Sequence, residues 1–121
     1  AEERRERVRC LRLSAALAAL RAGPGAAAAV ALLKCDVEGA EVAVLRGLDA
    51  ADWPRVRNLA VEVHSPEALQ ALRGLLAERF EGRVWSRPQP ELPGHCMLYA
   101  EACSEDASEL EPPLKRCRTK K

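Results

Sequence analysis

Short apolar runs alternate with segments of helical periodicity along most of this chain, and this alternation restricts the possible folds more than any other feature. Strands are predicted at residues 8–13, 29–35, 59–63, 83–86 and 95–100. Helices are predicted between them at residues 15–22, 39–48 and 66–79. Alternation at this spacing is typical of right-handed βαβ crossovers, which build a parallel sheet. Because the last two strands have no helix between them, we expect an antiparallel edge. The prediction is an α/β fold with a mostly parallel sheet.

Local signals support several of these elements. Ser14 is a plausible N-cap for the first helix, and Ser65 is one for the third, with Pro66 at its first helical position and Arg79 at its end. The run 29–35 is apolar on both faces except for Lys34, a pattern typical of a buried parallel strand.

Composition excludes some classes of protein. A formal net charge of +1 indicates neither a nucleic acid nor an anionic membrane as partner. The longest apolar stretch, residues 26–33, is far shorter than the roughly 20 residues that span a bilayer. The 5 cysteines have no CxxC spacing, which argues against a structural zinc site. Their odd number, without a secretory signal, favours reduced thiols in an intracellular and cytoplasmic protein.

Polar side chains at the ends of two predicted strands mark the candidate site. Asp36 and Glu38 follow the run 29–35, while Glu62 lies near the end of the run 59–63 and His64 directly follows it. In open α/β sheets, ligands bind beyond the carboxyl ends of the strands. If the two strands are neighbours, Asp36, Glu62 and His64 converge there. Such a group can take a proton from an attacking hydroxyl, or it can hold a divalent cation that lowers the pKa of that hydroxyl.

Structural roles for the same residues remain open at this point. Asp36 suits the N-cap of the next helix, and Glu38 and Glu41 suit its first turn, where acids interact favourably with the helix dipole. His64 precedes Ser65 and Pro66, so it also fits an ordinary loop position. Lys34 is best explained as a strand-end lysine that extends its ammonium group into solvent.

Residues 102–121 have almost no periodic apolar content, so we predict a disordered tail. Its last seven residues, 115–121, are mostly basic and resemble a nuclear import signal or a nucleic-acid contact. The favoured interpretation is a solvated tail whose charge is balanced by the acidic stretch 101–111, which makes a nucleic-acid partner an unfavoured alternative.

Residues 32–41 read Leu-Leu-Lys-Cys-Asp-Val-Glu-Gly-Ala-Glu, and residues 44–47 read Val-Leu-Arg-Gly. This pattern resembles the hallmark of FkbM-type methyltransferases, an apolar strand, Lys-Ile-Asp-Val-Glu-Gly-Ala-Glu and then Val-Leu-x-Gly. The surrounding segments agree, since residues 8–13, 61–64 and 95–100 look like neighbouring strands of that family. One departure is Cys35, where isoleucine is usual.

The resemblance implies a fold, an activity and a set of site residues. Residues 1–101 would be a partial FkbM-type domain, namely the C-terminal half of a Rossmann-like class I sheet with an antiparallel last strand. The activity would be S-adenosylmethionine-dependent O-methyl transfer to a small-molecule or glycan hydroxyl. Asp36, Glu62 and His64 would be catalytic, and Asp36, Glu38 and Gly39 would contact the cofactor, with a divalent cation as a possible second cofactor.

The sequence also lacks features that such enzymes use. It contains no Gly-rich turn after a first strand and no acid-ended second strand, and its first residue is Ala rather than Met. We therefore expect a fragment of a longer protein, with little or no activity by itself. The alternative is a non-catalytic remnant that uses its basic tail for binding.

Overall fold

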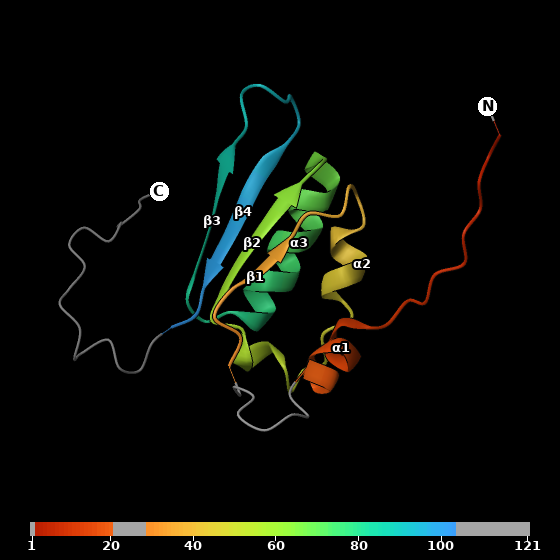
Figure 1. Ribbon diagram of the computed structural model, residues 1–121. Helices are drawn as coiled ribbons and strands as arrows, with labels where there is room; N and C mark the ends of the chain where they lie inside the picture. The colour runs from red at the N-terminus through yellow and green to blue at the C-terminus, as the bar shows by residue number, and fades with distance from the viewer. Residues whose placement is uncertain (1, 21–28, 104–121) are drawn as a thin grey trace.

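The computed structural model describes residues 2–20 and 29–103 (Figure 1). In chain order the elements are α1 (Leu13–Leu20), β1 (Leu33–Cys35), α2 (Glu41–Leu45), the short 3-10 helix η1 (Trp53–Arg55), β2 (Asn58–Val63), α3 (Pro66–Arg79), β3 (Arg83–Pro88) and β4 (Cys96–Glu101). The predicted α/β class is confirmed.

The strands form one mixed sheet in the order β1-β2-β4-β3. β1 is parallel to β2, with Cys35 opposite Val61, whereas β4 is antiparallel to both β2 and β3. Three strands therefore share one direction, and β4 is reversed. The predicted antiparallel pairing of the last two strands is confirmed, but the reversed strand lies inside the sheet and β3 forms the edge (Figure 1). The sheet was predicted to be mostly parallel. Three of its four strands do share one direction, but only the β1–β2 pairing is parallel.

The hydrophobic core lies between the sheet and two helices on one of its faces. Both α2 and α3 contact β2 and each other, and Figure 1 shows them on the same side of the sheet. Burial alternates along β2, because every second side chain points toward these helices. The largest apolar side chains that are fully buried are Leu45, Leu59, Leu72, Leu76 and Leu98. The opposite face carries half-buried side chains such as Trp85 and Tyr99, whose rings stack at 5.3 Å between centroids.

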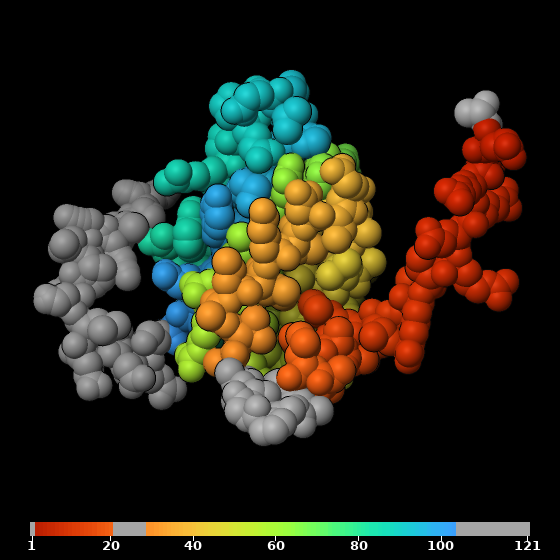
Figure 2. Space-filling model, viewed as in Figure 1, coloured from red at the N-terminus to blue at the C-terminus, as the bar shows by residue number. Residues whose placement is uncertain are grey.

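The predicted strand at 8–13 is wrong. Residues 2–12 form an extended arm outside any strand, shown in red in Figures 1 and 2, and Val8 and Leu11 are exposed. An alternating pattern forms a strand only when a neighbour supplies backbone hydrogen bonds, and within the described residues this segment has none. Leu13 instead begins α1 and packs on the core with Leu17.

The proposed N-cap of the first helix is also wrong. Ser14 lies within α1, which spans Leu13–Leu20 instead of residues 15–22, with residues 21 and 22 outside the described part. The buried Ser14 hydroxyl accepts a hydrogen bond from the backbone N–H of Asp49 at 2.7 Å. Its own N–H donates to the Gly47 carbonyl at 3.0 Å. The serine therefore joins α1 to the segment after α2.

Two elements are shorter than predicted. Of the run 29–35, only Leu33–Cys35 pairs as a strand, and Val30 adds an isolated bridge to Val56. Lys34 is exposed, as expected, so β1 is not buried on both faces. The helix predicted at 39–48 is reduced to Glu41–Leu45. Its start is delayed because Glu38 and Gly39 have positive φ angles of 52° and 107°, which helices do not accommodate.

The third helix follows its prediction. It spans Pro66–Arg79, and the Ser65 hydroxyl accepts a hydrogen bond from the Ala68 N–H at 3.1 Å. We expect Ser65→Ala to lower the free energy of unfolding by about 1 kcal/mol, because that N–H loses its partner. Urea denaturation measures the effect, and Ser65→Asp, which restores an acceptor, is the matched control. Equal stability of Ser65→Ala and the parent would show that the cap is dispensable.

The sheet continues slightly beyond the predicted domain boundary. The Ala102 N–H donates to the Arg57 carbonyl at 2.8 Å, and Ala102 packs against the core. The rest of the predicted tail, residues 104–121 with the basic end 115–121, lies outside the described residues. Among the residues that are described, the helices are all too short or too polar to cross a bilayer.

Candidate functional site

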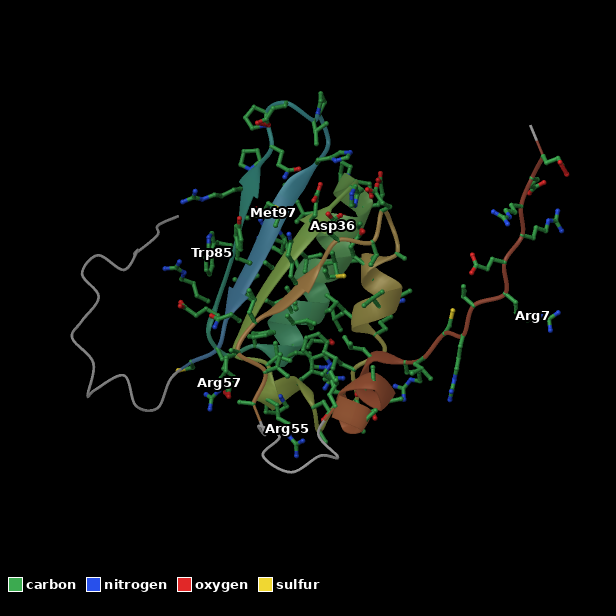
Figure 3. All side chains as sticks on the ribbon, in the orientation of Figure 1. Arg7, Asp36, Arg55, Arg57, Trp85 and Met97 are labelled. Carbon is green, nitrogen blue, oxygen red and sulfur yellow. The ribbon has the colours of Figure 1, made fainter. Side chains whose placement is uncertain are left out.

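Parallel pairing of β1 and β2 brings the predicted site residues together. Since Cys35 is opposite Val61, Asp36 follows β1 at the level where Glu62 lies near the end of β2 and His64 directly follows it. Figure 3 labels Asp36 at the end of β1, among several side-chain oxygens at the upper edge of the sheet. The predicted convergence of Asp36, Glu62 and His64 at the carboxyl ends of neighbouring strands is confirmed.

The His64 imidazole lies at the centre of this group. Its Nε2 atom is 3.8 Å from Asp36 Oδ1, 3.6 Å from Glu38 Oε2 and 3.9 Å from Glu62 Oε1. The His64 side chain is only 14% exposed, whereas those of Asp36 and Glu38 are 40% and 86% exposed. Three carboxylates from two strand ends therefore surround one ring nitrogen without a direct hydrogen bond to it.

Glu41 holds the other ring nitrogen, and sequence reasoning missed this role. The Glu41 side chain is 0% exposed, and its Oε2 is 3.1 Å from His64 Nδ1. The same oxygen accepts the Gly39 N–H at 2.7 Å, while Oε1 is buried without a partner. A signal was present in the sequence, because Glu41 is four residues before Leu45 and thus shares the helix face that points into the core.

Asp36 and Glu62 interact with each other. A side-chain hydrogen bond with Asp36, followed by desolvation and by the negative charge of Asp36, raises the pKa of Glu62, and His64 partly opposes this shift. The Glu62 carboxyl group therefore keeps its proton to a higher pH than an isolated glutamate does.

Three of the structural alternatives are now excluded. The N-cap of α2 is Ala40, and no side chain caps this helix, so Asp36 does not have a capping role. Glu38 precedes the helix and is not in its first turn, whereas Glu41 does occupy the first turn. His64 is held by Glu41 and is not an ordinary loop residue.

The need for glycine at position 39 follows from backbone geometry. Gly39 has a φ of +107°, and an added Cβ would meet no protein atom within 4 Å. Space therefore exists beside this residue, but amino acids other than glycine rarely adopt this backbone conformation. The turn made by Glu38 and Gly39 sets the start of α2, and with it the position of Glu41.

His95 is a further site residue that sequence reasoning placed only in a strand. It lies one residue before β4, and its ring meets that of His64 edge to face, with 4.9 Å between centroids. Its Nδ1 is buried without a hydrogen-bond partner. Backbone hydrogen bonds fix its position, because its N–H donates to Leu92 and its carbonyl accepts from Gln89. No spacing in the sequence relates His95 to His64, since only the β2–β4 pairing brings them together.

Fold and site together define an α/β domain whose acidic and histidine side chains gather at the carboxyl ends of its parallel strands. The family model described as "Methyltransferase FkbM domain" matches residues 2–103. The chain therefore belongs to the FkbM methyltransferase domain family, which agrees with the resemblance in the segment 32–47.

Two curated relatives are similar over shorter stretches. The chain is 48% identical over 52 residues to "31-O-demethyl-FK506 methyltransferase FkbM" of Streptomyces tacrolimicus, a match that covers 39% of this chain and 20% of that protein. It is 51% identical over 39 residues to "Methyltransferase sdnD" of Sordaria araneosa, covering 32% of this chain and 15% of the relative. The alignments thus span only a small part of either relative. No solved structure matches the chain.

Proposed function

We propose that the chain carries the acceptor-activating part of an S-adenosylmethionine-dependent O-methyltransferase, with a small-molecule or glycan hydroxyl as acceptor. The observation that carries the proposal is the group of Asp36, Glu62 and His64 at the carboxyl ends of β1 and β2. The reversed direction of β4 supports it, because the family resemblance implies a Rossmann-like class I sheet with an antiparallel last strand. One relative also has a name that describes O-methylation.

The turn after β1 has the properties that a cofactor contact requires. The carboxylates of Asp36 and Glu38 reach solvent and attract a cationic amine or accept from a hydroxyl. Gly39 beside them has no side chain that would restrict access. S-adenosylmethionine, when bound, supplies the transferred methyl group.

Glu41 prepares His64 for proton transfer. A carboxylate only accepts hydrogen bonds, so the ring proton of neutral His64 belongs on Nδ1, facing Glu41 Oε2. The lone pair of Nε2 then faces Asp36, Glu38 and Glu62. An acceptor hydroxyl bound among these groups finds an imidazole nitrogen and carboxylates that orient it and accept its proton.

Methyl transfer by two samples tests this proposal. One is the complete product of the gene that encodes this chain, and the other is the 121-residue chain alone. We expect the complete product to move a labelled methyl group onto a hydroxyl oxygen, and we expect little or no transfer by the chain alone because it lacks a Gly-rich turn.

Two results would contradict the proposal. The first is transfer by the complete product to nitrogen, sulfur or carbon acceptors but not to hydroxyls. The second is full activity of the 121-residue chain alone, which would show that this chain is sufficient for methyl transfer. Product mass together with chemical stability of the new methyl bond identifies the atom that is methylated.

A further inference from the structure

The proton transfer proposed above assigns no role to His95. Its ring is half-buried, and its buried Nδ1 has no partner, although burying a polar nitrogen without a hydrogen bond costs free energy. The ring meets His64 edge to face across the ends of β2 and β4. An unpartnered imidazole nitrogen held beside a second imidazole indicates a ligand that binds both.

The donor atoms around this position have the composition of a metal site. One ligand atom each from Glu62, His64 and His95 lies within 4.8 Å of the other two. Two imidazoles and one carboxylate form the donor set found in three-ligand zinc sites and in non-haem iron sites, which keep positions open for water or substrate. All three residues are half-buried, so the site is partly shielded from solvent.

A second set of residues, Asp36, Glu38 and His64, also clusters. It offers a single imidazole, and its two carboxylates are 40% and 86% exposed. Exposed carboxylates are well hydrated and bind cations weakly. The set that contains both histidines is therefore the better candidate for a transition metal ion.

Glu41 completes the arrangement from outside the donor set. Metal-binding histidines almost always donate their other ring N–H to a carboxylate or carbonyl, which fixes the ring and makes the ligating nitrogen more basic. Glu41 Oε2 is 3.1 Å from His64 Nδ1 and is itself held by the Gly39 N–H. The Nε2 atom of His64 is thereby left free, 3.9 Å from Glu62 Oε1.

The geometry points to a binding site for one divalent first-row transition metal ion, ligated by Glu62, His64 and His95, with Glu41 as the outer partner of His64. Zinc ligands at about 2.0–2.1 Å from the ion are separated by about 3.4 Å in a tetrahedral site. Binding therefore draws these side chains, now within 4.8 Å of one another, closer together.

The inference shares residues with the proposed function but does not require methyl transfer. A bound ion would lower the pKa of a coordinated hydroxyl. His64 Nε2 and Glu62 would then be ligands, and Asp36 would remain as the proton acceptor. Binding of the metal alone can be measured in the absence of any methyl donor, so failure of one proposal is distinguishable from failure of the other.

Titration of the purified 121-residue chain with Co²⁺ tests the site. Cobalt is the probe because its absorption spectrum separates nitrogen and oxygen ligation from ligation by the cysteine thiolates. We expect one Co²⁺ per chain, with a spectrum free of thiolate charge-transfer bands. Glu41→Gln should weaken binding by about 10–100-fold, and His95→Gln should weaken it further.

Two matched variants separate this site from a general attraction of cations. Glu38→Gln removes a carboxylate 3.6 Å from His64 Nε2 and should leave one bound Co²⁺, because Glu38 is not a predicted ligand. Glu81→Gln removes an exposed carboxylate before β3 and should change nothing. Circular dichroism and thermal unfolding show whether each variant keeps the fold.

Each possible outcome has a definite meaning. A folded His95→Gln variant that binds Co²⁺ as tightly as the parent would overturn the proposal, as would a parent chain that binds none. A thiolate spectrum would place the metal on cysteines instead. Loss of binding in Glu38→Gln but not in His95→Gln would favour the exposed set and would equally overturn it.

Discussion

Replacing Asp36 with asparagine is expected to lower the turnover number of methyl transfer by the complete gene product by about 100-fold or more. Asparagine keeps the size of the side chain but cannot accept a proton from the acceptor hydroxyl. It also removes the negative charge of Asp36, which contributes to the raised pKa of Glu62. Stability should change little, because Asp36 is 40% exposed and does not cap α2. Steady-state kinetics with a labelled methyl donor, together with urea denaturation, measures both quantities.

Asp49→Asn is the matched control for this experiment. Asp49 forms an exposed ion pair with Arg12 at 2.6 Å, at the opposite end of α2 from the site. Exposed pairs contribute about 0–1 kcal/mol, so both turnover and stability should stay close to the parent values. Full turnover in Asp36→Asn would remove Asp36 from the proposed chemistry. Equal losses in both aspartate variants would indicate a general effect of charge.

Replacing Gly82 with alanine is expected to lower the free energy of unfolding by about 3 kcal/mol or more. Gly82 lies immediately before β3, where the chain passes close to the end of β4. An added Cβ would lie 2.7 Å from the Cys103 nitrogen and 2.8 Å from the Ala102 carbonyl carbon, and closer still to the Glu101 oxygen. These are backbone atoms of a paired strand and its continuation, so they cannot rotate away as a side chain would.

Gly74→Ala provides the opposite expectation with the same chemical change. Gly74 lies within α3, and an added Cβ there meets nothing within 4 Å. Alanine should raise the free energy of unfolding by up to about 1 kcal/mol, because it favours the helix over the unfolded chain. Urea denaturation of the two variants provides the comparison. Similar stabilities for Gly82→Ala and Gly74→Ala would mean that β3 and β4 do not approach as described.

Elements with strong local signals could be predicted from the sequence. Both β2 and α3 were predicted nearly to their boundaries, since the former is an apolar run and the latter has a serine cap, a proline and helical spacing. The segment 8–13 has a similar apolar alternation but forms no strand among the described residues. Strand formation depends on a partner, and no local pattern reports whether the partner is present.

The candidate site could be predicted in part for a similar reason. Asp36, Glu62 and His64 directly follow or end two strands, so a correct guess of neighbouring strands was enough to bring them together. Glu41 was interpreted as a helix-dipole partner, because its burial depends on the short turn at Glu38 and Gly39. His95 comes from a different part of the chain, and only the position of β4 between β2 and β3 places it beside His64.

That position of β4 also determines when the site can exist. During synthesis, β1, β2 and α3 are all available before β4, yet the gap between β2 and β3 can be filled only after Cys96–Glu101 has emerged. Val63 pairs with Cys96, so the same event delivers His95 to His64. Pairing of segments this distant in sequence is slow compared with helix formation. A nascent chain thus exposes Asp36, Glu62 and His64 without their last neighbour, and the complete site appears only with the finished sheet.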